Sequence, residues 1–168
     1  MSWKYAMLAA VLVGGVAQAA TKTSPNRTSE VFFDFDSSQI RDRDAAKISD
    51  LAKWSARHPN KKLVLAAHAD PIGTSDYNVG LSTRRGEAVR DALILAGVAR
   101  DRIVIATFGE DGPKRATKAQ DRRVTISTTS APLYVIIDRT LNPATAVVWT
   151  EPASVADIEG PRQPIATR

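Results

Sequence analysis

The sequence predicts an α+β fold, a small mixed β-sheet with its helices packed on one face. Strand-length runs rich in apolar and β-branched residues alternate with two segments whose apolar residues recur at helical spacing. Gly and Pro residues mark the ends of several of these segments. A helix that follows a strand favours a parallel neighbouring strand and a right-handed crossover, so the expected order is β-α-β-α-β-β.

The first half of this order is read from three runs. Residues 31–35, VFFDF, have strand composition and precede a turn-like DSSQI. Residues 42–57 repeat apolar positions at helical spacing, and Pro59 ends that helix. Residues 62–69, KLVLAAHA, read as a buried strand bounded by proline and glycine.

The second half begins with a helix that we expect to start at Ser82, whose hydroxyl would cap the first turn. Gly97 ends this helix. Strands are expected at residues 102–108 and 122–128, joined by a polar loop. The inner face of the helix is expected to consist of Val89, Ala92, Leu93 and Ala96.

The two ends of the chain differ from the domain at residues 31–129. Residues 1–19 contain one lysine, an apolar run too short to span a bilayer, and Ala17-Gln18-Ala19, which together predict a signal peptide. Residues 20–30 are polar and read as a linker. We therefore expect a mature chain with no transmembrane segment, exported to the periplasm.

A C-terminal extension covers residues 130–168. Its two apolar runs, LYVIID and ATAVVW, predict a β-hairpin over residues 133–149, followed by an irregular tail. The hairpin either extends the sheet of the domain itself or adds edge to edge to a partner protein.

Composition excludes several classes of function. The chain has no cysteine, which excludes disulfides, thiolate metal sites and lipid attachment to cysteine. The formal charge of +5 falls to +4 once Lys4 leaves with residues 1–19. Because the basic residues are scattered among 18 acids and form no stripe, we expect no nucleic-acid partner.

One pair of opposite charges falls at a position where α/β sheets bind ligands. Asp70 follows a strand, and Arg85 follows the expected cap of the next helix, so the two side chains can share one cleft. They can close the loop as an ion pair. Alternatively, they can bind a zwitterion, with the arginine on its carboxylate and the aspartate on its ammonium.

The stretch NVGLSTRRGEAV, residues 78–89, resembles the signature N-x-x-L-S-x-x-R-A-x-x-V of the OmpA-like C-terminal domain. That domain is the peptidoglycan-binding module of outer-membrane proteins, peptidoglycan-associated lipoproteins and flagellar stator proteins. Four more blocks resemble the family in the same order: VFFDFDSSQI, HADPIGTSDYN, FGEDGP and QDRRVTI. Within the family, the chain resembles the peptidoglycan-associated lipoprotein type but lacks the lipid-bearing cysteine of that type.

The resemblance implies an OmpA-like fold and a site for meso-diaminopimelate, the stem-peptide amino acid whose outer centre carries an ammonium and a carboxylate. By position, the acid that holds the ligand is Asp70 and the arginine is Arg85. The remaining site positions implied by the family are Asp34, Phe35, Asn78, Leu81 and one of Arg122 and Arg123. Gly86 departs from the alanine of the signature and is expected to weaken the helix slightly.

The function expected from the resemblance is non-covalent binding of peptidoglycan, which tethers an envelope component to the cell wall near the outer membrane. We expect no cofactor, no metal ion and no catalytic residue. Two alternatives stay open. The chain could be the wall anchor of an envelope-spanning assembly. It could also be a wall hydrolase whose general acid/base site or hydrolytic metal centre is built from Asp34, Asp36, Asp70 and His68. Against the hydrolase, neither histidine lies in an H-E-x-x-H motif and there is no G-x-S-x-G.

Overall fold

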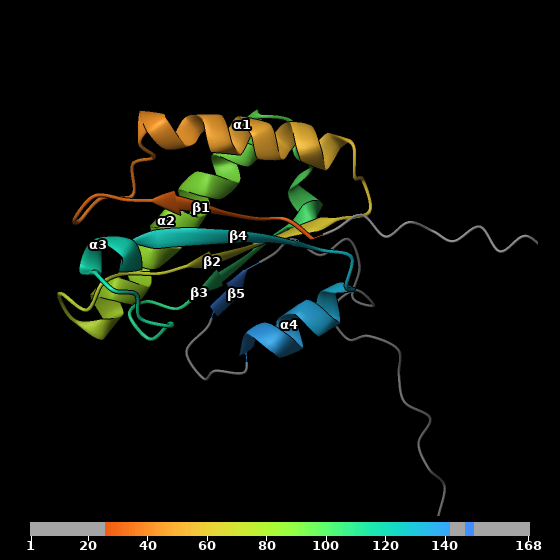
Figure 1. Cartoon of the computed structure of the whole chain (residues 1–168). Coiled ribbons are helices and arrows are strands. Elements are labelled where there is room, and N and C mark those ends of the chain that lie inside the picture. The colour runs from red at the N-terminus through yellow and green to blue at the C-terminus, as the bar shows by residue number, and fades with distance from the viewer. Residues whose placement is uncertain (1–25, 142–146, 150–168) are drawn as a thin grey trace, which may run out of the picture.

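The computed structural model describes residues 26–141 and 147–149 (Figure 1). These residues form one five-stranded sheet with the strand order β1-β4-β2-β3-β5. The pair β2 and β3 is parallel and the other neighbouring pairs are antiparallel, so the predicted mixed sheet is confirmed. In chain order the elements are β1 (Thr28–Phe32), α1 (Asp42–Ala56), β2 (Lys62–Ala67), α2 (Ser75–Leu95), the 3₁₀ helix η1 (Arg100–Arg102), β3 (Ile103–Thr107), α3 (Lys118–Asp121), β4 (Arg123–Thr129), α4 (Leu133–Leu141) and β5 (Val147–Trp149).

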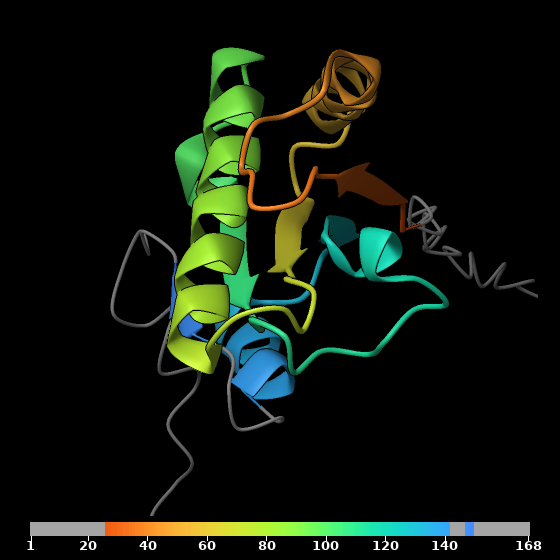
Figure 2. The same ribbon diagram turned by 90° about the vertical axis from the view of Figure 1, so that its left-hand side faces the viewer.

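Helices α1 and α2 pack on the same face of the sheet, as the sequence predicts (Figures 1 and 2). Apolar residues at helical spacing on α1, such as Ile48 and Leu51, meet Val89 and Leu93 of α2 in one cluster with the strands. Alternate residues of β2 point into this cluster, which is the period of two expected of a strand. All five residues of β3 are buried, because both faces of that strand are covered.

The predicted hairpin over residues 133–149 is wrong. Residues 133–141 form helix α4, and only Val147–Trp149 form a strand, which pairs antiparallel with β3. Helix α4 covers the second face of the sheet, where Leu133 and Ile136 pack on Val104 (Figure 1). The apolar residues of α4 that reach the sheet lie three and four positions apart, a helical spacing that the β-branched composition concealed. Residues 142–146 and the tail from residue 150 lie outside the described residues.

The expected start of the second helix at Ser82 is also wrong. Helix α2 begins at Ser75, and the Thr74 hydroxyl accepts a hydrogen bond from the backbone N–H of Tyr77 at 3.4 Å. The first turns of α2 contain buried polar residues in place of an apolar stripe, so hydrophobic periodicity does not reveal them. Ser82 donates to the Val79 carbonyl and accepts from Gly109 N–H, which ties the middle of the helix to the loop after β3.

The first strand lies three residues earlier than predicted. Thr28–Phe32 pairs with β4, so the linker expected over residues 20–30 ends before Thr28. Val31 alone is fully buried in this strand, and the polar residues before it conceal the strand from a composition argument. Residues 1–25, which include the expected signal peptide, lie outside the described residues. None of the helices in the described part of the chain is long and apolar enough to cross a membrane.

Candidate functional site

A small pocket lies where the loops after β1 and β2 meet the first turns of α2. Its volume is about 170 Å³. Helix α2 supplies Tyr77 and Leu81, and the two loops supply the other lining residues. The full lining consists of Phe35, Asp36, Asp70, Ile72, Gly73, Tyr77 and Leu81.

Asp70 lies in the wall of this pocket, three residues after the end of β2. The residue is only 3% exposed, and its Oδ2 accepts a hydrogen bond from Arg122 Nη1 at 2.9 Å. Arg122 also donates to the Phe33 carbonyl at 3.2 Å, so it joins the ends of β1 and β2. Among the described residues, none bonds to Asp70 Oδ1. One carboxylate oxygen at the pocket is therefore available to a ligand.

Arg85 does not lie in the first turn of its helix, contrary to expectation, and it does not line the pocket. It lies in the middle of α2 with 0% exposure. Its guanidinium donates to three backbone carbonyls, those of Ser37 at 2.8 Å, Asp34 at 3.1 Å and His68 at 3.2 Å. Within the described chain it forms no ion pair with Asp70. Arg85 therefore holds together the turn after β1 and the segment after β2, the two walls of the pocket.

Burial lowers the pKa of Arg85 to about 10, and the negative charge of Asp70 opposes this shift. The guanidinium is thus still charged at neutral pH. A guanidinium has five N–H donors, and three of those of Arg85 are used by the carbonyls. The other two N–H groups have no hydrogen-bond partner among the described residues, but the side chain is fully buried, so Arg85 contributes its positive charge and not a contact surface.

The two acids after β1 have different surroundings. The side chain of Asp34 is 74% exposed and lies 3.9 Å from Arg41, outside the pocket lining. Asp36, which the sequence analysis did not place in the site, lines the pocket and adopts a positive φ of 52°. The Tyr77 hydroxyl donates to the Asp36 carboxylate, and this bond raises the pKa of Tyr77.

Three large apolar side chains remain exposed at the pocket: Phe35, Ile72 and Tyr77. Phe35, an expected site residue, is 58% exposed. Ile72 and Tyr77 were not singled out from the sequence. Their position within the HADPIGTSDYN block was the available signal.

Asn78 and Leu81, two of the signature residues on α2, are both buried. Leu81 contributes to the pocket wall. The side-chain amide of Asn78 donates to the Glu110 carboxylate, and its Oδ1 is buried without a hydrogen-bond partner among the described residues. Asn78 therefore joins α2 to the loop after β3, and it does not line the pocket.

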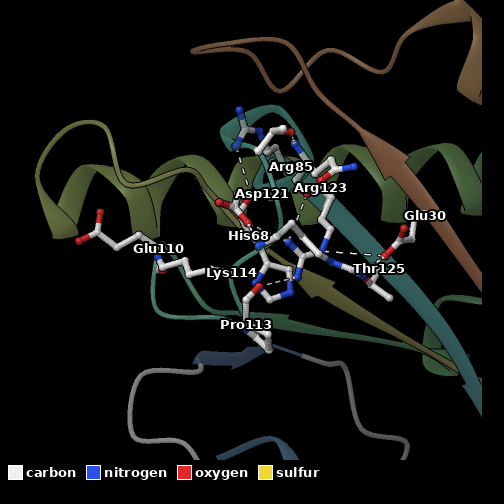
Figure 3. A network of polar contacts seen from close by, with 12 residues as sticks. Glu30, His68, Arg85, Glu110, Pro113, Lys114, Asp121, Arg123 and Thr125 are labelled. Carbon is white, nitrogen blue, oxygen red and sulfur yellow. Dashed lines mark hydrogen bonds and ion pairs between the residues drawn. The ribbon is translucent and has the colours of Figure 1, made fainter.

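Arg122 and Arg123 point to different surroundings, although only Arg123 belongs to β4 and Arg122 ends the short helix α3. Arg122 faces Asp70, whereas Arg123, the first residue of β4, is buried in the polar network that includes His68 and Asp121 (Figure 3). Arg123 donates to the carbonyls of Pro113 at 3.2 Å and Gln120 at 3.3 Å. Of the two arginines, Arg122 is the one that contacts a residue of the pocket lining, Asp70.

His68 is buried in the same network and has the environment of a neutral ring (Figure 3). It stacks on Phe108 with ring centroids 5.0 Å apart, and its Nδ1 has no hydrogen-bond partner among the described residues. Burial and the positive charges of Arg123, Arg115 and Lys114 lower the pKa of His68 to about 3. A ring in these surroundings is a poor general base at neutral pH. Across the described residues, no three His, Asp or Glu side chains are grouped to hold a metal ion.

Comparisons with known proteins agree with this architecture. Residues 32–126 match the OmpA family. The peptidoglycan-associated lipoprotein of Rhizobium meliloti (strain 1021) is 39% identical over 83 residues, which cover 49% of this chain and 47% of that protein. The match therefore spans about half the length of this relative.

Two further relatives match over more of their own length. The peptidoglycan-associated lipoprotein of Mesorhizobium japonicum is 30% identical over 131 residues, which cover 64% of this chain and 78% of that protein. The crystal structure of the peptidoglycan-associated lipoprotein from Burkholderia pseudomallei superimposes with a TM-score of 0.56 at 33% identity, covering 60% of this chain and 89% of that chain.

Proposed function

The chain belongs to the OmpA family, and on that premise we propose that it binds peptidoglycan non-covalently through the diaminopimelate of the stem peptide. The pocket between the loops after β1 and β2 is the binding site in this proposal. The names of the similar lipoproteins support an association with the wall. The protein acts in the periplasm as a wall-bound tether, after removal of residues 1–19, and it is not an enzyme.

The observation that carries the proposal is the free Oδ1 of Asp70 at the pocket. The ammonium of the ligand binds this oxygen while Oδ2 keeps its bond to Arg122. A charge-assisted hydrogen bond of this kind is about twice as strong as a neutral one. Asp36, at the same pocket, adds a second negative charge for the ammonium.

The carboxylate of the ligand is held on the side of the two arginines. Arg85 supplies a fixed positive charge beneath the pocket, and Arg122, whose side chain is 17% exposed, is the cation that the carboxylate contacts directly. The aliphatic part of diaminopimelate packs against Phe35, Ile72 and Leu81. A pocket of this size is smaller than the 300 Å³ or more of a drug-sized site, so it accommodates one end of one amino acid.

The test is co-sedimentation with purified sacculi that contain diaminopimelate. Asp70→Asn removes the charge and keeps the shape, and we expect binding to weaken by about a hundredfold, equivalent to 2–3 kcal/mol for a partly desolvated charge pair. Asp50→Asn, the same change at an exposed position of α1, is the matched control and should bind normally. Melting temperatures of both variants separate lost binding from lost folding.

Sacculi with lysine in place of diaminopimelate give a second arm. Lysine lacks the outer carboxylate, so binding to these sacculi should fall for the unaltered protein. Equal binding to both wall types, or undiminished binding by folded Asp70→Asn, contradicts the proposed site. Release of soluble muropeptides from either wall would instead indicate a hydrolase.

A further inference from the structure

A second and larger cavity lies beside the first turns of α1. Its volume is about 430 Å³, and it is bounded by the end of β1, the N-terminal half of α1 and the short helix α3. Its floor includes the ring of Phe32, and its walls include Arg41, Arg43, Lys47 and Gln120. We call this cavity the cationic groove.

The groove is positively charged. Its lining contains three basic residues and a single acid, Asp44, so its formal charge is 3 − 1 = +2. Asp44 is buried and pairs with Arg41 at 2.9 Å and with Lys47 at 2.6 Å. Arg43 is exposed and forms no ion pair with any described residue. The groove therefore has a net positive charge that its own acid does not neutralise.

Cations and an aromatic ring lie together in the groove. The Arg41 guanidinium lies 5.9 Å and the Lys47 ammonium 5.6 Å from the centroid of the Phe32 ring. Lys47 is also held by the Glu30 carbonyl at 3.0 Å, and its side chain is still 44% exposed. Such a site suits a carboxylate attached to an apolar chain, since the ring contacts the chain and the cations contact the charge.

The groove and the diaminopimelate pocket both border the loop that joins β1 to α1. A third cavity, of about 280 Å³, lies between them and is lined by Asp34, Ser37, Gln39 and Arg41 among others. It shares Arg41 with the groove, and its residues Asp34 and Ser37 are the chain neighbours of the pocket residues Phe35 and Asp36. The three cavities thus border the same loop, within reach of one extended polymer.

We infer that the cationic groove binds a second carboxylate of the peptidoglycan stem peptide, while diaminopimelate occupies the pocket. The inference rests on the proposed function. The chemistry is that of the free α-carboxylate of the γ-linked glutamate or of the terminal carboxylate of the stem. Because both groups belong to one polymer, the second contact is intramolecular and raises the apparent affinity for the wall without affecting free diaminopimelate.

The test compares Arg43→Glu with Lys53→Glu, which makes the same charge change on an exposed lysine of α1 outside the groove. An acid is favoured in the first turn of a helix, so Arg43→Glu should fold, and its melting temperature checks this. We expect Arg43→Glu to bind diaminopimelate-type sacculi about fivefold to tenfold more weakly than Lys53→Glu at low salt. The difference should shrink as salt is added.

Calorimetry with free diaminopimelate separates the two proposals. Both variants should bind it as the unaltered protein does, since neither residue lines the pocket. If the unaltered protein binds neither diaminopimelate nor sacculi, the proposed function fails and this inference fails with it. If Arg43→Glu and Lys53→Glu bind sacculi equally while free diaminopimelate still binds, only the inference is overturned.

Sacculi with amidated glutamate identify the source of the carboxylate. A difference between the two variants that disappears on this wall assigns the groove to the glutamate α-carboxylate, and one that persists assigns it to the stem terminus. If Arg43→Glu instead keeps its full wall affinity and loses only binding to an acidic envelope protein, the groove is a protein-docking surface and the inference is wrong.

Discussion

The two faces of the sheet are covered to very different extents. On one face, α1 and α2 bury a cluster of fifteen residues together with β1, β2, β3 and β4. On the other, α4 buries Leu133 and Ile136 against Val104. The first face contains the bulk of the apolar burial in the described chain, which is the main source of stability for a domain of this size.

The ligand site follows the same division. Every residue that lines the pocket belongs to α2 or to the loops after β1 and β2, and α4 contributes none. The buried arginine beneath the pocket is likewise on α2. Folding of the first face and formation of the site are therefore coupled, while the α4 face can be weakened separately. The predictions below test this division.

The largest effect is expected for Arg85→Ala. The substitution leaves the carbonyls of Asp34, Ser37 and His68 without their buried donor. Disruption of a buried charged network costs about 3–5 kcal/mol in free energy of unfolding. Urea denaturation measures it, with Arg84→Ala on the exposed side of the same helix as the control, expected within about 0.5 kcal/mol of the unaltered protein. Equal stability of the two variants would contradict the structural role of Arg85.

On the second face, Ile136→Ala should cost about 2–4 kcal/mol, because it removes a buried side chain between α4 and β3. Binding to sacculi by the folded protein should not change, since α4 is absent from the pocket lining. The measurement pairs urea denaturation with co-sedimentation at a temperature where the variant is folded. A fall in wall affinity by the folded variant would show that the two faces are coupled.

How far the fold follows from the sequence also differs between the two faces. Periodicity predicts α1, β2, β3 and β4 to within one or two residues, because their apolar positions repeat where they face the main cluster. On the second face it fails, since the β-branched residues of 133–137 favour a strand by composition and a helix by spacing. These residues form a helix because the helix covers the second face of the sheet. That packing is a tertiary contact, which the local sequence does not reveal.

For the candidate site, the sequence predicts the position of Asp70 better than it predicts the contacts of the arginines. The position of Asp70 after β2 follows from the βα unit, and the structure places it at a pocket. The contacts of Arg85 could not be predicted, because they depend on carbonyls of two loops far apart in the sequence. Alternation predicts that Arg122 and Arg123 diverge, and tertiary packing then determines which one meets Asp70.

A substitution at Gly86 tests how closely α2 packs on the sheet beneath the site. Alanine is the better helix former, and the OmpA-like signature has alanine here, yet a Cβ at this position would lie 2.7 Å from Ile105 Cγ2. We expect Gly86→Ala to lower the free energy of unfolding by about 1–3 kcal/mol through overpacking. The double variant with Ile105→Val should recover part of this loss, which a double-mutant cycle measures. Stabilisation by Gly86→Ala alone would show that the helix can move away from β3.

The smallest expected effect is a pH dependence that arises from His68. Its pKa is lowered from an ordinary 6.5 to about 3, because burial and nearby positive charges oppose the imidazolium. Between these two values the unfolded chain binds more protons than the folded one, so stability is complete above pH 6.5 and falls as the pH drops toward 3. From pH 7 to pH 5 we expect a loss of about 1–2 kcal/mol, which urea denaturation at both values measures.

Two variants isolate the contribution of His68. His68→Gln should remove most of the loss between pH 7 and pH 5, whereas His58→Gln, at the half-buried histidine that stacks on Trp54, should retain it. Asp44 does not interfere, because its pKa is lowered from 3.8 and its own contribution is lost only below this range. If His68→Gln and the unaltered protein lose the same stability over this interval, then His68 is protonated in the folded state. The loop after β3 would then have to move away from the ring, because a charged imidazole needs a partner for the Nδ1 proton and Gly112 leaves no room for one.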